Sequence, residues 1–293
     1  MKILILGHTG FLGNALFYYF KQSQSCSVEG CSSSEIDLSS PSSPHQLKQL
    51  LNKETVVIVS SRSRKNQNDF EGYCQNVTMY QHIAQALELQ PVKKCLFLSS
   101  NIVYGEGGED QILSEKTPAN PTSLYGASTI AGEQVLRISA NKMKFPITIL
   151  RICKVYGPGD TDTVSYSPGN FLDSLLREDK IFLFGKGEEK RDFLFVNDFS
   201  KIVARMVLNN AEGTFNLATG ESISFQKIST LLGSITNTQP KIIFKKRTRP
   251  IIDISFQLDK LMQIIPGFQF TKIEQGLIKT HEHIVENSSL PGK

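Results

Sequence analysis

The sequence predicts an α/β protein built on a doubly wound parallel sheet, and three observations lead to this fold class. Short apolar runs rich in β-branched residues recur through the first half of the chain, as in residues 2–6 and 55–60. Such runs are typical of strands buried on both faces of a parallel sheet. Segments with helical character separate them, which is the alternation that parallel strands need for their crossovers. The first run ends in a turn with three glycines, and a helix follows at once.

Taken in order, the predicted elements alternate between strand and helix. We expect strands at residues 2–6, 27–31, 55–60, 94–99, 193–196 and 213–218, and helices at residues 14–22, 76–89, 127–141 and 268–283. A further helix should begin at Asn197 and Asp198, with the Asp198 side chain as its N-terminal cap. The elements therefore predict a sheet whose strands are joined by helices on both faces.

The composition bounds the class of protein. The 293 residues suffice for one large domain or for a domain with a smaller partner. The net charge of +4 is mild, and the basic clusters at residues 62–65 and 245–247 are short, so we interpret them as solvated faces or a ligand rim. We expect an anionic small ligand and no nucleic acid. No run of about 18 apolar residues occurs, so no membrane span is expected.

The cysteines indicate a reducing compartment. Their number is odd and no CxxC pair occurs, which argues against a disulfide framework and predicts no metal site. Cys95 and Cys153 lie in apolar, strand-like runs and should be buried thiols. We therefore expect a cytoplasmic protein.

The glycine turn after the first strand has the GxxGxxG spacing of a dinucleotide-binding loop. Gly7 permits the tight turn, Gly10 lets the backbone approach a pyrophosphate, and Gly13 lets the helix pack on the strand. The helix N-terminus adds N–H donors and the positive end of its dipole. We expect the cofactor contacts of this turn to come from Gly7, Thr9, Gly10, Phe11, Leu12 and Gly13.

The end of the second strand bears on the choice of cofactor. NAD-binding sheets commonly place a carboxylate there for the adenosine ribose hydroxyls. Here Ser32 and Ser33 follow the strand, without an acidic residue. Their hydroxyls could donate hydrogen bonds to a 2′-phosphate, although no arginine accompanies them. The sequence therefore favours NADP and leaves NAD as the alternative.

Two hydroxyl-bearing segments predict the reactive centre. Ser99 and Ser100 end the strand at 94–99, and ligands of such sheets bind outside the carboxyl ends of strands. Tyr125 opens the helix at 127–141. A phenol has a pKa of about 10, so it needs stabilisation of its charged form to act near neutral pH.

In order along the chain, these segments resemble the extended short-chain dehydrogenases/reductases, in their nucleotide-sugar-modifying epimerase/dehydratase branch. The resemblance rests on GHTGFLG at 7–13, SSNIVYG at 99–105, YGAST at 125–129, LRICKVYGPG at 150–159 and FGKGEEKRDF at 184–193. It covers residues 1 to about 283. It implies a Rossmann-type dinucleotide-binding domain at 1–157 and 195–220, a smaller, mostly C-terminal substrate lobe at 158–194 and 221–293, and a homodimer formed through the tyrosine helix and its neighbour.

The resemblance assigns catalytic roles and exposes one departure. Ser100 would orient the substrate oxygen, and Tyr125 would transfer the proton. Thr129 stands where the family has the lysine that stabilises the phenolate. Lys154 replaces a family asparagine that faces the substrate, so our hypothesis is that Lys154 supplies the missing charge or pairs with a substrate phosphate; the alternative is a lysine that reaches solvent.

The same resemblance implies further contacts. The cofactor side comprises Ser32, Ser33, Asp37, Ser60, Ser61, Arg62, Asn76, Ser99 and Tyr125. The substrate side comprises Ser100, Asn101, Lys154, Asn170, Arg191 and Arg249, the two arginines on the diphosphate.

The expected function follows from these residues. Asn101 and Ile102 occupy the places of the acid–base pair with which family dehydratases eliminate water, so dehydration is not expected. We predict an NAD(P)-dependent reductase of a nucleotide-diphosphate 4-keto sugar, serving surface-polysaccharide precursors of bacterial type. The alternatives are a nucleotide-sugar 4-epimerase and, because of Thr129, an inactive dinucleotide-binding sensor or partner-binding protein.

Overall fold

The structure of the chain is a computed structural model. The structure describes residues 1–23, 26–63, 65–66, 69–105, 107, 111–160, 167–209 and 211–288. Among these residues, no helix combines the length and the apolar character that a membrane crossing requires.

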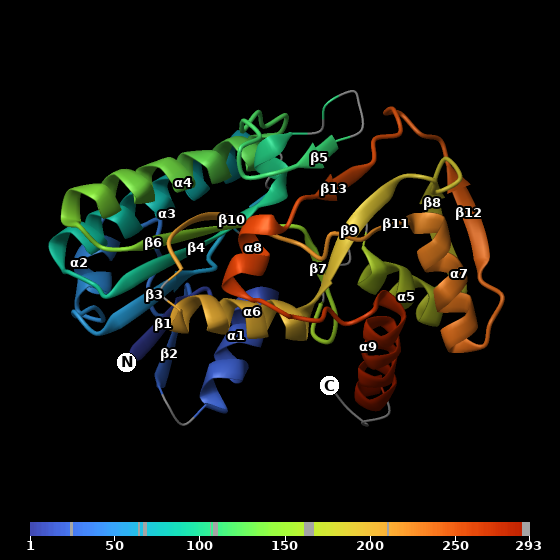
Figure 1. Ribbon diagram of the computed structural model, residues 1–293, viewed down its shortest axis with the longest axis horizontal. Helices are drawn as coiled ribbons and strands as arrows, with labels where there is room; N and C mark the ends of the chain where they lie inside the picture. The colour runs from blue at the N-terminus through green and yellow to red at the C-terminus, as the bar shows by residue number, and fades with distance from the viewer. Residues whose placement is uncertain are drawn as a thin grey trace.

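A sheet of six parallel strands forms the centre of the molecule, which confirms the predicted fold class (Figure 1). The strand predicted at 193–196 lies outside this sheet, because the segment pairs with strands of a smaller one, and residues 147–152 supply a strand of the large sheet instead. In spatial order the strands of the large sheet are β10 (Gly213–Leu217), β6 (Ile147–Ile152), β4 (Lys94–Ser100), β3 (Thr55–Val59), β1 (Lys2–Leu6) and β2 (Ser27–Cys31). The chain passes from β1 to β2 on one side and then to β3 on the other, so the strand order reverses next to β1. Ligands of open α/β sheets bind at such a reversal, outside the carboxyl ends of the strands.

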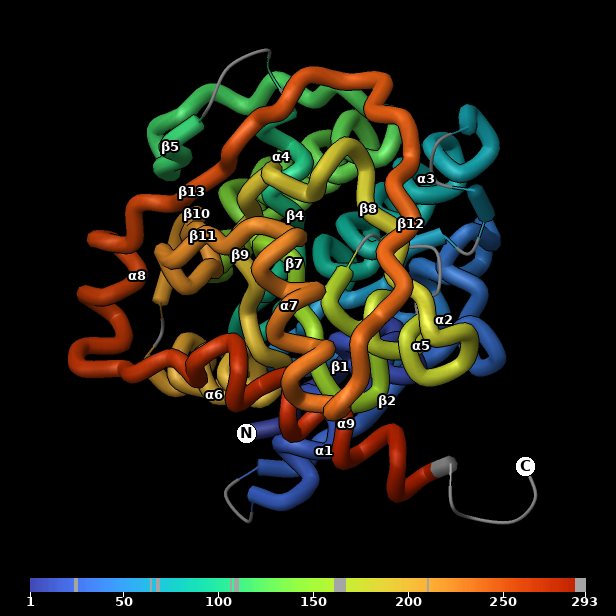
Figure 2. Tube along the Cα trace, turned by 90° about the vertical axis from the view of Figure 1, so that its right-hand side faces the viewer, coloured from blue at the N-terminus to red at the C-terminus, as the bar shows by residue number. Residues whose placement is uncertain are grey.

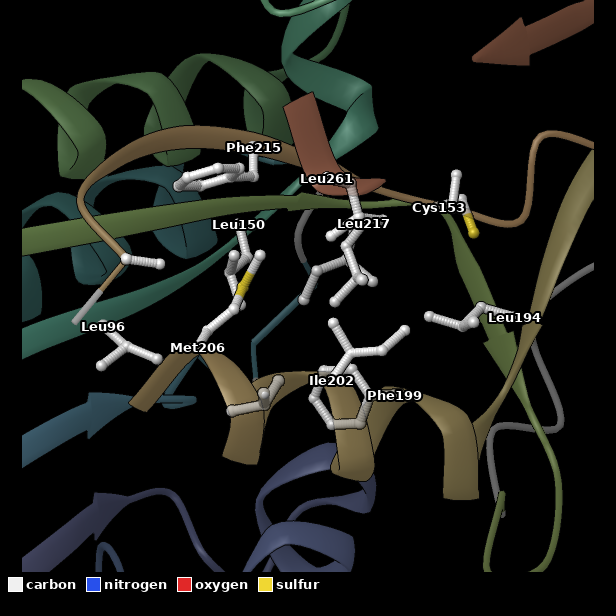
Figure 3. Packing of buried hydrophobic residues seen from close by; sticks show 14 of the residues in the cluster. Leu96, Leu150, Cys153, Leu194, Phe199, Ile202, Met206, Phe215, Leu217 and Leu261 are labelled. Carbon is white, nitrogen blue, oxygen red and sulfur yellow. The ribbon is translucent and has the colours of Figure 1, made fainter. Parts of the chain in front are cut away.

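Helices cover both faces of this sheet (Figure 1). On one face lie α2 (Ser43–Lys48), α3 (Phe70–Leu89) and α4 (Leu124–Met143), and on the other lie α1 (Phe11–Lys21) and α6 (Val196–Leu208). Alternate strand residues enter two separate cores, so that Ile3 and Ile5 pack in one while Leu4 and Leu6 pack in the other. Figure 3 shows the first core, where α6 points its apolar side chains at the sheet.

A second, smaller assembly lies beside the sheet (Figures 1 and 2). Here β9 (Lys190–Phe195) lies between β11 (Ser222–Ser224) and β7 (Lys154–Tyr156) and pairs with both. β12 (Lys241–Lys245) pairs with β8 (Lys180–Phe184), and β13 (Ile254–Phe256) pairs with β5 (Gln111–Leu113). Its helices are α5 (Pro168–Glu178), α7 (Phe225–Thr236) and α9 (Ile273–Ser288), and the short helix α8 (Asp259–Ile264) packs near β10. Tyr156, Phe171 and Phe225 belong to a third core here.

Local capping explains where the structure departs from the predicted boundaries. α3 begins at Phe70 rather than Asn76, because the Asp69 carboxylate accepts a hydrogen bond from the Gly72 N–H at 2.9 Å and caps the helix earlier. α4 likewise begins at Leu124, where Ser123 is the cap.

The predicted cap at Asp198 is wrong. Phe195 is the N-cap residue of α6, and Asp198 lies inside the first turn. Its carboxylate accepts a hydrogen bond from the Thr271 N–H at 2.6 Å and thereby fixes the segment that enters α9. That last helix begins at Ile273 instead of residue 268, since Phe268 and Phe270 precede it and pack edge to face.

Candidate active site

Ser100 ends β4 at the carboxyl edge of the sheet. Its Oγ accepts a hydrogen bond from the Ile102 N–H at 3.3 Å, which caps the 3-10 helix η1 (Asn101–Tyr104). The side chain is half-buried. β4 extends beyond the last residue that pairs with β3, Phe97, so the serine stands forward of the neighbouring strand.

Tyr125 comes to the same place from the first turn of α4. The following residue must be glycine for this approach, because a Cβ at Gly126 would lie 2.9 Å from the Ile102 carbonyl oxygen. Gly126 therefore lets α4 press against η1. The phenol of Tyr125 lies within hydrogen-bonding reach of the Ser100 and Thr129 side chains. The structure thus brings together three of the four predicted catalytic side chains.

The environment of Tyr125 acts on its pKa in both directions. Burial raises the pKa above its ordinary value, and this effect prevails. The charge of Arg62 and the hydrogen bonds to Thr129 and Ser100 lower it. Arg62 is the cation with the largest electrostatic effect on the phenol, whereas the sequence suggested only a cofactor contact for it.

Thr129 provides no charge at the position of the family lysine. It is fully buried, and its hydroxyl donates a hydrogen bond to the Tyr125 carbonyl oxygen at 2.8 Å. Lys154 lies in β7, outside the six-stranded sheet, and is half-buried in register with Phe193 of β9. Asn101, the other candidate substrate contact on this side, is half-buried in η1.

A buried polar network lies directly beneath the two candidate catalytic residues. Ser99 donates a hydrogen bond to Glu133 of α4 at 2.6 Å, and the Arg151 guanidinium binds the same carboxylate with two hydrogen bonds of 3.0 and 2.8 Å. Arg151 also stacks over the ring of Tyr104. The Ser99 hydroxyl therefore serves the interior, where it links β4 to the helix that carries Tyr125.

The glycine turn forms a cradle that fits a dinucleotide. Gly7 has φ of 85°, and a Cβ there would lie 2.8 Å from the Ser61 Cα. At Gly13 a Cβ would lie 2.2 Å from the Gly7 carbonyl oxygen, whereas Gly10 faces more open space. α1 begins here without a side-chain cap, which leaves its first N–H groups available to an anion.

Other residues around the cradle agree with this use. His8 Nδ1 and Ser61 Oγ are buried without a hydrogen-bond partner within the described chain, so each is available to a ligand group. Thr9 is exposed, and Phe11, Leu12 and Ser60 are partly exposed. Asn76 is fully buried and accepts a hydrogen bond from the Ser63 N–H at 2.7 Å, so it holds the loop after β3 in place.

The end of β2 carries a carboxylate that the sequence prediction missed. Glu35 folds back so that its carboxylate accepts hydrogen bonds from the Ser32 N–H at 2.5 Å and from the Ser32 hydroxyl at 2.6 Å. These bonds lower the pKa of Glu35 below its ordinary value. Ser33 is exposed beside it, and Asp37 accepts hydrogen bonds from Ser39 within a turn.

On the substrate side, Arg191 is held inside the protein. Its buried guanidinium pairs with Glu189 and donates to the carbonyl oxygens of Lys190 and Ile252. Arg247, which the prediction passed over, pairs with the same carboxylate at 2.6 Å. Asn170 lies in the first turn of α5, and Arg249 is exposed. A cavity of about 500 Å³ opens beside Arg247, lined also by Lys186, Gln226 and residues 244–246.

The sequence match decides the family. A model of the NAD dependent epimerase/dehydratase family matches residues 3–218. The chain belongs to this family. A GDP-6-deoxy-D-talose 4-dehydrogenase from Aggregatibacter actinomycetemcomitans is 27% identical over 249 residues, 83% of this chain and 82% of the relative. An uncharacterized UDP-glucose epimerase of Bacillus subtilis (strain 168) is 27% identical over 183 residues, 61% of this chain and 57% of that protein. The match thus spans little more than half of the second relative.

Solved structures of epimerase/dehydratase proteins share the fold over nearly the whole chain. A UDP-glucuronic acid 4-epimerase variant from Bacillus cereus, in complex with UDP-4-deoxy-4-fluoro-glucuronic acid and NAD, superposes with a TM-score of 0.86 at 21% identity, over 98% of this chain and 100% of that one. For the UDP-glucose 4-epimerase of Thermus thermophilus in complex with NAD, the TM-score is 0.85 at 20% identity, over 99% and 100%.

Proposed function

We propose that this member of the epimerase/dehydratase family is an NAD-dependent reductase of a 4-keto sugar carried on a nucleotide diphosphate. One observation carries the proposal: the Tyr125 phenol and the Ser100 hydroxyl meet at the carboxyl edge of the sheet that also bears the glycine cradle. A hydroxyl and a phenol in contact can together bind and protonate a carbonyl oxygen.

The residues suit this chemistry. A nicotinamide bound through the cradle would supply the hydride for the carbonyl carbon. Ser100 donates a hydrogen bond to the carbonyl oxygen and orients it. Tyr125 gives its proton to the same oxygen as negative charge develops there, so the carbonyl becomes a secondary alcohol and the phenolate is later reprotonated from water. No acid–base pair for dehydration accompanies them, since Asn101 and Ile102 follow Ser100.

Glu35 supports NAD over NADP. Its carboxylate lies at the end of β2, next to the glycine cradle on β1, where it can accept hydrogen bonds from the adenosine ribose. A 2′-phosphate at that place would meet a negative charge and be repelled. The preference for NADP that Ser32 and Ser33 suggested is therefore replaced in our proposal by a preference for NAD.

Similarity to one relative favours reduction over epimerisation, and the contact between Ser100 and Tyr125 favours it over a protein without catalysis. The relative that is similar over 83% of this chain is a 4-dehydrogenase of a nucleotide sugar, whose reaction in reverse is a ketoreduction. A 4-epimerase is the second candidate, supported by the shared fold of the two UDP-sugar 4-epimerases. A sensor without catalysis would have no use for the contact between Ser100 and Tyr125.

The nicotinamide absorbance tests the proposal. We expect the purified protein to oxidise NADH when one of a panel of 4-keto nucleotide sugars is added, and Tyr125→Phe to lose at least about a hundredfold in rate, the usual contribution of a positioned acid. Calorimetric binding of NADH to both proteins is the control, because the variant keeps the whole glycine cradle and loses only one hydroxyl. Tight NADH binding with no turnover of any keto sugar would instead identify a sensor.

A further inference from the structure

The turn of α4 after Tyr125 lacks a cation, although the phenol needs one. Burial raises the pKa of Tyr125, and Thr129 can offer only a hydroxyl, whose proton is directed to the Tyr125 carbonyl oxygen at 2.8 Å. A neutral hydroxyl stabilises an adjacent anion far less than an ammonium group does. If Tyr125 transfers a proton near neutral pH, another positive charge has to act on it.

Arg62 lies at the carboxyl edge of the sheet, the same edge at which Ser100 and Tyr125 meet, and it can provide that charge. It follows β3, the strand that lies between β1 with its glycine cradle and β4 with Ser100. The three strands are parallel and in register, Val59 pairing with Leu6 on one side and with Phe97 on the other, so their carboxyl ends meet at one edge.

A chain of hydrogen bonds ties the Arg62 loop to the helix of Tyr125. The Ser63 N–H donates to Asn76 Oδ1 at 2.7 Å, and Asn76 Nδ2 donates to Ser128 Oγ at 3.2 Å. Ser128 Oγ in turn donates to the Tyr125 carbonyl oxygen at 2.9 Å. Asn76 and Ser128 have no exposed surface, so this connection is shielded from water. The loop is therefore held in a fixed relation to the phenol.

The charge of Arg62 lowers the pKa of two phenols. It acts on Tyr125 and also on Tyr80 of α3, whose buried ring packs edge to face on Phe97 and against Gly132. Within the described chain no carboxylate pairs with Arg62, and Glu71 at the start of α3 pairs with Lys65 instead, at 3.1 Å. Among the described residues, Arg62, Ser100 and Thr129 act on the Tyr125 phenol, and Tyr80 is the second phenol coupled to it.

We propose that Arg62 replaces the missing lysine of α4: its guanidinium stabilises the phenolate of Tyr125 from the loop after β3, while Asn76 and Ser128 hold that loop at the helix. This inference rests on the proposed function for its purpose, because a phenolate is useful only where Tyr125 moves a proton. Arg62 is a positioning and electrostatic residue of the reaction, and Thr129 keeps only the hydrogen bond.

Direct titration of Tyr125 tests the inference without any substrate. The tyrosinate absorbance is followed against pH in the protein bound to NAD, and the curve of Tyr125→Phe is subtracted to isolate this phenol. We expect Arg62→Met to raise the midpoint by about one pH unit, the effect of a single nearby charge, and Arg62→Lys to restore most of it. Arg62→Met with Thr129→Lys should restore it as well.

Two further variants separate Arg62 from other cations. Lys65→Met removes a charge from the same loop, and Lys154→Met removes the cation that the sequence suggested; neither should move the midpoint. Melting temperatures show whether each variant is folded, which is expected for Arg62→Met because the side chain is exposed. An unchanged midpoint in folded Arg62→Met, or an equal shift in Lys154→Met, overturns the inference.

The titration tests the role of Arg62 and the turnover assay tests the proposed function, so that either proposal can fail without the other. If wild type reduces a keto sugar but Arg62→Met leaves the midpoint of the Tyr125 titration unchanged, the role of Arg62 is wrong and the proposed function stands. If the midpoint depends on Arg62 and no keto sugar is turned over, the proposed function is wrong while the coupling of Arg62 to Tyr125 stands. Where both hold, the pH–rate profile of Arg62→Met should move with the midpoint and cost about tenfold in rate at neutral pH.

Discussion

Single residues that act across the fold decide the chemistry of this site. Glu35 folds back onto Ser32 and places a carboxylate at the end of β2, and Arg62 directs its charge at a tyrosine that follows it by more than sixty positions. In our proposals, each side chain supplies a charge that the family resemblance places at another position. The residue that performs a role therefore need not stand at the usual position, provided that the fold brings it to the same place.

Cofactor choice should depend on Glu35. Glu35→Ala removes the carboxylate that would repel a 2′-phosphate, so we expect the ratio of NADH to NADPH affinity to fall by at least about tenfold, mainly through better NADPH binding. Isothermal calorimetry with both cofactors measures the ratio. Glu29→Ala is the matched control, because it removes a carboxylate of β2 that pairs with Lys2 and belongs to no predicted cofactor contact. Equal ratios in wild type and Glu35→Ala would show that the carboxylate has no part in the preference.

At this scale the sequence predicted the local features and missed the ones made across space. Ser100, Tyr125 and the three glycines belong to contiguous motifs, so the neighbouring residues along the chain are enough to identify them. Glu35 was missed because it stands four residues beyond the second strand, and its return to Ser32 depends on side-chain torsions that no motif encodes. Arg191 was predicted from its motif, but its hydrogen bond to the Ile252 carbonyl oxygen depends on how β9 meets a segment some sixty residues away.

At the scale of elements, one buried ion pair fixes α4 to the sheet. Glu133 has no exposed surface, and it binds Arg151 of β6 and Ser99 of β4. The pair therefore sets the position of the helix that carries Tyr125 relative to the strand that carries Ser100. A buried charge without its partner is costly, whereas replacing both partners is often tolerated.

Breaking this pair should loosen the site and the fold together. We expect Glu133→Gln to lower the free energy of unfolding by about 3 to 5 kcal/mol, because Arg151 is left charged and unpaired in the interior. Urea unfolding at neutral pH measures the loss. The double variant Glu133→Gln with Arg151→Met should recover part of it, and a double variant as unstable as the sum of both single variants would show that the pair itself adds nothing.

Because of Lys94, we expect the free energy of unfolding to change with pH in the alkaline range. Lys94 lies buried at the start of β4, where its ammonium donates to the Met206 carbonyl oxygen at 2.9 Å. Burial lowers its pKa from 10.5 to about 8. Between these two values the unfolded chain binds more protons than the folded one, so this group makes the fold more stable as the pH rises.

The variant Lys94→Met isolates that effect. The destabilising contribution of the charged amine is fully present below pH 8 and is relieved as the pH rises toward 10.5. Relative to Lys94→Met, wild type should therefore gain about 2 to 3 kcal/mol of unfolding free energy over this range. Denaturant unfolding of both proteins at a series of pH values gives the difference, and a flat difference would mean that Lys94 stays charged in the fold.

At the scale of the whole molecule, the site lies where the large sheet meets the smaller lobe. β4, β3 and β1 present their carboxyl ends at one edge, and β7 leads from that edge into the lobe (Figure 1). Asp192 of β9 strengthens this junction, because its carboxylate accepts hydrogen bonds from the N–H groups of Thr219 and Gly220 just after β10. The alternation of strands and helices along the chain predicts the large sheet. The small sheets of the lobe pair segments that lie far apart in the sequence, so no alternation along the chain predicts them.

We expect the molecule to form a homodimer through α3 and α4. These helices run side by side, with Glu88 and Lys142 paired at 2.5 Å, and near this pair Leu89 is 43% and Ile138 64% exposed. Burying such side chains in a symmetric contact would stabilise a dimer. Light scattering should give the mass of two chains for wild type and of one for Ile138→Glu. Leu208→Glu, at an exposed apolar residue of α6, should leave the dimer intact.

The central claim is that the protein reduces a sugar carbonyl beside Tyr125 and Ser100 with hydride from a bound nicotinamide. Transfer of deuterium from NADH labelled on the transferred hydrogen to the sugar of a 4-keto nucleotide sugar, read by mass spectrometry, tests it most directly. We expect one deuterium in the product for each NADH consumed by wild type, and almost none with Tyr125→Phe. A product changed in configuration without external deuterium, or an unchanged substrate beside tightly bound NADH, would contradict it.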